Sequence, residues 1–143
     1  MWSGPRNVST ALMYSFARRP DTRVVDEPLY AHYLAVSGAL HPGRDEVLAA
    51  MDNDGEAVMR ALAHDPLSRP VLFVKQMAHH LVGIDPGWLD PFDNVLLIRD
   101  PRHMLPSLAD VLGEVTLRDT GLERQVELVE RLEAGGQFPF CLD

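Results

Sequence analysis

The chain has 143 residues, a length that suits one domain and leaves no room for two full ones. Its 13 basic and 21 acidic residues give a formal net charge of −8, which argues against non-specific nucleic-acid binding because that binding needs clustered lysine and arginine. No apolar run approaches the roughly 20 residues that span a bilayer, and a lone cysteine, Cys141, can form no internal disulfide. We therefore expect a cytoplasmic protein without membrane contact.

The first half of the chain alternates helical and strand patterns. Its first helix is indicated by Val8, Leu12 and Phe16, which recur every four residues and give one buried stripe. In chain order we predict a helix at 7–18, a short strand at 23–26, helices at 45–51 and 56–64, and an apolar strand at 71–74 that closes on Lys75.

The second half repeats the alternation. We predict a loop at 82–93, a buried strand at 94–98, a helix with Asp100 as its cap and Pro101 at its first position, a helix at 122–132, and the start of a strand at 138–142. This order of elements predicts a three-layer α/β/α fold with a mainly parallel sheet, of the P-loop nucleotide-binding type.

Both ends of the sequence look cut. A phosphate-binding loop normally follows a full β-strand, and here only Met1 and Trp2 precede a loop that begins at Ser3. At the other end, Phe138 to Leu142 has nothing after it. We therefore expect residues 1–143 to be one P-loop domain that is truncated at both ends.

Polar side chains follow three of the predicted strands at the point where each strand ends. They are Asp26 with Glu27, then Lys75, then Arg99. Because ligands of open parallel sheets bind at the carboxyl ends of the strands, this edge is the expected site.

The loop at the start of the chain has the features of a phosphate cradle. It leads straight into a helix, whose unpaired N–H groups and dipole attract anions. Arg6 adds a forked positive charge. The residues that we expect to bind phosphate are Gly4, Pro5, Arg6, Asn7, Val8, Ser9 and Thr10. The alternative is an ordinary helix start, capped by Asn7 or Ser9, with Arg6 in solvent.

A second pattern joins a strand end to a helix. Arg99 ends the strand at 94–98, and Ser107 lies eight residues later, about two turns into the next helix. A phosphate beside that strand end could accept hydrogen bonds from both side chains. The alternative is that Arg99 pairs with Asp100 and that Ser107 is an ordinary helix residue.

Together the two patterns resemble the nucleotide site of sulfotransferases, which use 3′-phosphoadenosine 5′-phosphosulfate as donor. Pro5-Arg6 matches the family's loop for the 5′-phosphosulfate, and Arg99 with Ser107 matches its element for the 3′-phosphate at the same spacing. The resemblance covers residues 2–132 and is closest to a bacterial branch whose module also occurs in plant branched-chain aminotransferase-like proteins. It departs from the family at Val8, where glycine is common, and at Arg6, where cytosolic members have lysine.

The resemblance implies sulfuryl transfer to an unidentified hydroxyl or amine, with Arg6 neutralising charge on the donor. Two residues could act as the base. His79 follows Lys75 as a histidine follows a lysine in cytosolic members, and Glu27 occupies a position where some members have a glutamate. Glu27 is slightly favoured, because repulsion between adjacent carboxylates should raise the pKa of one of them. The alternative for His79 and His80 is a pair on a helix face with one partly buried ring.

Other functions are also compatible with the sequence. A non-catalytic nucleotide-binding or interaction module would suit so short a chain. A magnesium-dependent P-loop kinase or hydrolase is less compatible, because Ser9 and Thr10 stand where that motif requires Gly-Lys. No metal site is expected, and neither the acceptor nor the oligomeric state can be deduced.

Overall fold

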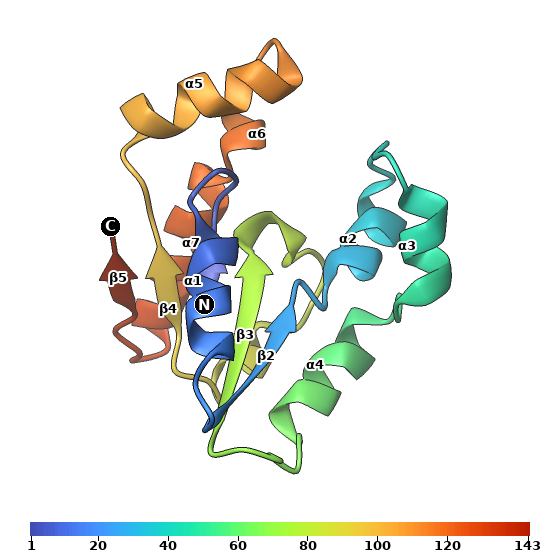
Figure 1. Ribbon diagram of the computed structural model, residues 1–143, viewed down its shortest axis with the longest axis vertical. Coiled ribbons are helices and arrows are strands. Elements are labelled where there is room, and N and C mark those ends of the chain that lie inside the picture. Colours follow the sequence, from blue (N-terminus) through green and yellow to red (C-terminus); the bar gives the residue numbers. More distant parts are fainter.

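The computed structural model describes residues 1–143 and is built around a five-stranded sheet in which every neighbouring pair of strands is parallel (Figure 1). The strands are β1 (Trp2–Ser3), β2 (Thr22–Asp26), β3 (Val71–Met77), β4 (Val95–Leu97) and β5 (Phe140–Leu142), in the spatial order β2-β3-β1-β4-β5. The predicted α/β fold with a parallel sheet is confirmed.

Helices connect the strands. They are α1 (Ser9–Ala17), α2 (Tyr30–Ser37), α3 (Arg44–Ala50), α4 (Gly55–Ala63), α5 (Pro101–Leu112), α6 (Leu117–Thr120) and α7 (Leu122–Ala134), with the 3-10 turns η1 (Ala78–His80) and η2 (Pro86–Leu89). The sequence patterns missed α2, whose apolar residues fall on all sides, and α6, which is a single turn. None of the helices is long and apolar enough to cross a membrane.

The expectation that the strand before the loop is missing was wrong. Trp2 and Ser3 form β1 at the centre of the sheet, where Trp2 lies opposite Gln76 of β3 and Leu96 of β4. The sheet thus holds the base of the loop from both sides. Ser3 accordingly belongs to the strand and not to the loop, and two residues are too few to show a strand pattern in the sequence.

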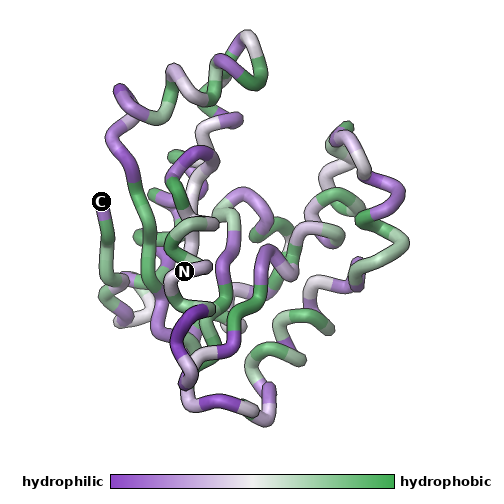
Figure 2. Tube along the Cα trace, viewed as in Figure 1, coloured by the Kyte–Doolittle hydropathy of each residue, from purple (hydrophilic) through white to green (hydrophobic).

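Helices cover both faces of the sheet, as the three-layer prediction requires. On one face α1 packs against β2 and β3, and the Phe16 and Phe73 rings stack with centroids 4.1 Å apart. On the other face Trp2 joins a buried cluster with Leu128 and Leu132 of α7. Figure 2 shows that the trace is apolar along β4 and becomes hydrophilic where the chain leaves this strand toward α5.

The order of the strands fixes where a ligand should bind. From β1 the chain moves to β2 and β3 on one side of the sheet, and only later crosses to β4 and β5 on the other. In open parallel sheets the crevice at such a reversal, beyond the carboxyl ends of the strands, is the usual ligand site. Here the reversal falls at β1, between β3 and β4, so the loops that follow β1 and β4 are the segments to examine.

Candidate functional site

The loop after β1 places unpaired main-chain donors at this end of the sheet. The amides of Arg6, Asn7 and Val8 donate no hydrogen bond within the protein. Val8 is the cap residue of α1, and no side chain caps that helix. The alternative that Asn7 or Ser9 caps the helix was therefore wrong, although Arg6 is exposed, as that alternative expected. Free amides at the start of a helix attract anions, so the loop before α1 is a candidate anion site.

Backbone strain is concentrated around the same edge. Four residues other than glycine have left-handed φ angles, and three of them follow β1 or β2: Arg6 at 60°, Val8 at 52° and Glu27 at 43°. A β-branched residue such as Val8 adopts this region rarely, at a cost of about 1–3 kcal/mol. The departure from the family's glycine thus falls where the backbone favours glycine, and strain of this kind is typical of functional sites.

The structure brings Arg6, Arg99 and Ser107 together. Nε of Arg6 donates to Oγ of Ser107 at 2.8 Å, although the two residues are 101 positions apart. Nη1 of Arg99 donates to the main-chain oxygen of Arg6 at 2.7 Å. The loops that follow β1 and β4 therefore bring together two guanidinium groups and a hydroxyl, a donor set that suits phosphate.

The alternative pairing of Arg99 with Asp100 was wrong. The Asp100 carboxylate accepts from the amide of Arg102 at 2.8 Å, and so caps α5 as predicted. It also forms an ion pair with the Arg102 guanidinium at 2.5 Å. Arg99 has no carboxylate partner, so its charge is available to a ligand.

The remaining loop residues have structural contacts or lie in the first turn of α1. Nδ2 of Asn7 donates to the main-chain oxygen of Leu97, at the end of β4, at 3.0 Å. Ser9 is buried and Thr10 is exposed at the start of α1. Gly4 lies so close to the main-chain oxygen of Thr120 that a Cβ atom would approach it to 3.0 Å.

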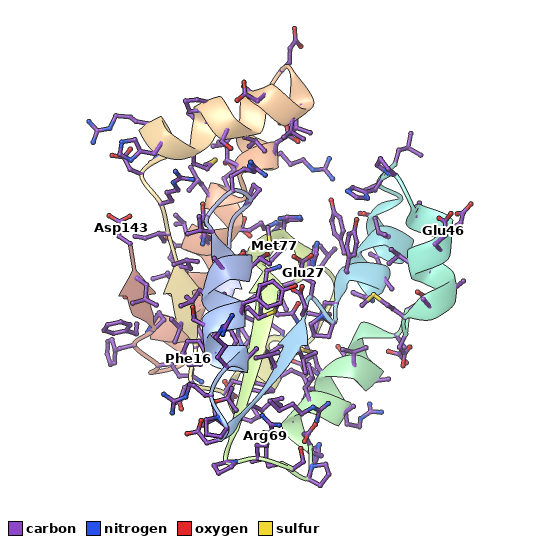
Figure 3. The ribbon with its side chains drawn as sticks, viewed as in Figure 1. Phe16, Glu27, Glu46, Arg69, Met77 and Asp143 are labelled. Carbon is purple, nitrogen blue, oxygen red and sulfur yellow. The ribbon has the colours of Figure 1, made fainter.

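A buried lysine joins the neighbouring strand ends. Nζ of Lys75, two residues before the end of β3, donates to Asp26 at 2.8 Å and to Glu27 at 2.5 Å. Burial alone would lower the pKa of Lys75, but the hydrogen bonds to the two carboxylates raise it above its ordinary value. The sequence argument for Glu27 counted only the repulsion between carboxylates and missed the ammonium that both contact. Figure 3 shows Glu27 beside Met77 at this end of the sheet, opposite the end where Arg69 lies.

The two histidines of η1 have different surroundings. The His80 ring is 2% exposed and stacks on Tyr30 and Tyr33, with centroids 5.1 Å and 4.9 Å away. The His79 ring is only partly buried, whereas Nδ1 of His80 is buried and has no hydrogen-bond partner. A Cβ atom on Gly121 would lie 3.5 Å from Pro5 and 3.7 Å from Nδ1 of His79, so His79 lies beside the loop. The alternative of a histidine pair on a helix face therefore differs from the structure. His79 and His80 lie in a 3-10 turn, and the His80 ring is fully buried.

The buried His80 ring should make the fold sensitive to acid. Burial lowers the pKa of His80 from 6.5 to about 3, helped by the nearby charges of His79, Lys75 and His41. Between these values the unfolded chain binds a proton that the folded protein does not, so stability falls as pH falls below 6.5. This group alone should lower the free energy of unfolding by about 2–3 kcal/mol between pH 7 and pH 4.5.

Urea unfolding at these two pH values tests this expectation. The control is His80→Phe, which keeps a ring between the tyrosines and removes the titrating group. The variant should lose clearly less stability than the wild type on acidification. An equal loss in both proteins would show that His80 does not carry the effect.

Sequence reasoning missed several residues that support the site. Tyr30 and Tyr33 lie on the unrecognised helix α2, and only their proximity to Glu27 in the sequence could have drawn attention to them. Gln125 lies on the predicted helix at 122–132 and is buried. The sequence pattern does not predict this burial, because glutamine is usually exposed.

Comparisons with known proteins identify the family of the chain. A family described as Sulfotransferase domain matches residues 1–137. Two proteins of Arabidopsis thaliana, branched-chain-amino-acid aminotransferase-like proteins 2 and 1, are 36% and 38% identical to the chain over 143 residues, which is 99% of the chain. The chain spans only 25% and 26% of these relatives. No solved structure matches. The chain belongs to the sulfotransferase domain family.

Proposed function

We propose that this chain binds 3′-phosphoadenosine 5′-phosphosulfate and transfers its sulfuryl group to a hydroxyl or amine acceptor. The observation that carries the proposal is the convergence of Arg6, Arg99 and Ser107 at the reversal point of the sheet. The loop amides and Arg6 would hold the 5′-phosphosulfate, and Arg99 with Ser107 would hold the 3′-phosphate. We propose that residues 1–143 form a single domain that binds the donor.

Donor binding would rearrange one contact that the structure shows. In the structure Nε of Arg6 donates to Oγ of Ser107, and this contact uses part of the donor capacity of the guanidinium. A 3′-phosphate at Ser107 would compete for that hydroxyl and leave Arg6 for the sulfuryl end of the donor. Binding of the 3′-phosphate at Ser107 and binding of the sulfuryl end at Arg6 would thus be coupled, because both require the Arg6–Ser107 hydrogen bond to break.

The transfer itself requires charge neutralisation and one proton acceptor. The acceptor oxygen or nitrogen attacks sulfur, the bond between sulfur and the phosphate oxygen breaks, and adenosine 3′,5′-bisphosphate leaves. Arg6 and the loop amides would stabilise negative charge on the leaving phosphate oxygen. The acceptor's proton goes to a base, which must lie within hydrogen-bond reach of the acceptor.

The geometry favours His79 as that base, although the sequence slightly favoured Glu27. Glu27 already accepts a hydrogen bond from the Lys75 ammonium at 2.5 Å, which uses part of its capacity to accept a proton. His79 lies beside the loop, and burial lowers the pKa of its ring below 6.5. A histidine with such a pKa is neutral at pH 7 and can accept a proton. We propose that Lys75 and Glu27 form the charged wall beside it.

A transfer assay distinguishes an enzyme from a non-catalytic nucleotide-binding module. Donor carrying a ³⁵S label is incubated with the protein and a panel of alcohols, phenols and amines, and labelled product is separated from donor. The proposal requires product with at least one acceptor class, without added metal. Binding of the donor without any product would support the non-catalytic module instead.

A further inference from the structure

The corner between α6 and α7 packs directly against the back of the phosphate loop. Gly121, with a φ of 69°, ends α6 and precedes α7. A Cβ atom on Gly4 would come within 3.0 Å of the main-chain oxygen of Thr120, and one on Gly121 would come within 3.5 Å of Pro5. The corner and the loop therefore touch main chain to main chain, and movement of one must displace the other.

Gln125, one turn into α7, ties this corner to the end of β4. Its side chain is 3% exposed, and its Nε2 donates to the main-chain oxygen of Leu97 at 3.0 Å. The same oxygen accepts from Nδ2 of the loop residue Asn7, also at 3.0 Å. One carbonyl group thus anchors both the loop and the helix behind it.

An apolar residue at position 125 should make the protein more stable than glutamine does. Oε1 of Gln125 is buried and has no hydrogen-bond partner, and Oδ1 of Asn7 shares that condition. Buried polar atoms without partners destabilise a protein and are rare. The same face of α7 buries Leu128 and Leu132, so leucine would suit position 125 and would leave Asn7 as the partner of the Leu97 oxygen. Local arrangements that cost stability are commonly found at functional sites.

We propose that Gln125 is a positioning residue for the donor: it holds the α6–α7 corner against the loop and thereby keeps the strained backbone at Arg6 and Val8 ready for phosphate. This inference rests on the proposed function, which identifies the ligand as the sulfuryl donor. Without the amide, the loop would spend less time in its binding conformation, and apparent affinity falls in proportion to that population.

The experiment compares Gln125→Leu and Gln125→Met with the wild type and with Val126→Leu, a change at the exposed neighbour on the same helix. Three quantities are measured on each protein. They are the thermal midpoint, the rate at which trypsin cleaves after Arg6 relative to cleavage after Arg18, and the dissociation constant of adenosine 3′,5′-bisphosphate. The cleavage rate reports loop opening without any ligand.

Both Gln125 variants should keep or raise the thermal midpoint, open the loop to trypsin faster, and bind the bisphosphate about tenfold more weakly. Val126→Leu should resemble the wild type in all three. Unchanged cleavage and affinity would overturn the inference, and so would a collapse of the thermal midpoint in both variants, which would make Gln125 a purely structural residue. A third outcome separates this inference from the proposed function. If the Gln125 variants are cleaved faster but the wild-type protein does not bind the bisphosphate, then Gln125 positions the loop and the proposed function is refuted.

Discussion

Arg6→Ala is expected to weaken binding of adenosine 3′,5′-bisphosphate by about 1.5–3 kcal/mol, the range for a hydrogen bond to a charged group. That corresponds to roughly a tenfold to hundredfold loss of affinity. Arg6 lies at the tip of the loop, and its guanidinium is within hydrogen-bond distance of Ser107. Calorimetric titration measures the effect. The fold should be retained, because the loop anchor from Arg99 reaches the main-chain oxygen of Arg6 and does not involve its side chain.

Arg18→Ala is the matched control. Arg18 is exposed at the far end of α1 and lies outside the site, so the variant changes the net charge by the same amount as Arg6→Ala. It should bind the bisphosphate within about twofold of the wild type, because interactions between exposed charges are screened beyond about 10 Å. Equal losses in the two variants would mean that only overall charge matters, and an unchanged affinity in Arg6→Ala would refute the assignment of Arg6.

His79→Gln is expected to lower the turnover number by about a hundredfold to ten-thousandfold, the range for loss of a general base. Donor affinity should change little, since His79 would contact the acceptor and not the nucleotide. In the wild type the rate should rise with pH through the pKa of His79, because only the neutral ring accepts a proton. Since burial lowers that pKa, the rate should fall only below pH 6.5.

Glu27→Gln separates the two candidate bases. It removes a carboxylate that is already hydrogen-bonded to Lys75 and leaves His79 in place. We expect a loss of about tenfold or less, arising from altered charge at the wall of the site. A far larger loss in Glu27→Gln than in His79→Gln would show that Glu27 is the base and that the order inferred from the geometry is wrong.

The sequence predicted the parts of the site that depend on neighbouring residues. The Pro5-Arg6 turn and the spacing of Arg99 and Ser107 lie in short segments, and their convergence follows once the sheet is parallel. Asp100 and Pro101 mark the start of α5 for the same local reason. Features of this kind can be read from a sequence because the physics that produces them acts within one turn or one strand.

Other features depend on contacts between distant residues. Lys75 neutralises Asp26 and Glu27 only because β2 and β3 pair in a particular register, with Asp26 opposite Lys75. β1 is recognisable only from its two neighbours, because two residues have no periodicity. Gln125 matters because its helix packs against the loop, and an isolated glutamine in an amphipathic helix looks like an exposed residue.

Titration of the wild-type protein with adenosine 3′,5′-bisphosphate, compared with ATP in the presence and absence of magnesium, tests the central claim most directly. The proposed site of Arg6, Arg99 and Ser107 would bind two separate phosphates and would need no metal ion. The bisphosphate should therefore bind more tightly than ATP, and EDTA should leave its affinity unchanged. Tighter binding of magnesium-ATP, or no binding of the bisphosphate, would contradict the assignment of this crevice as a sulfotransferase donor site.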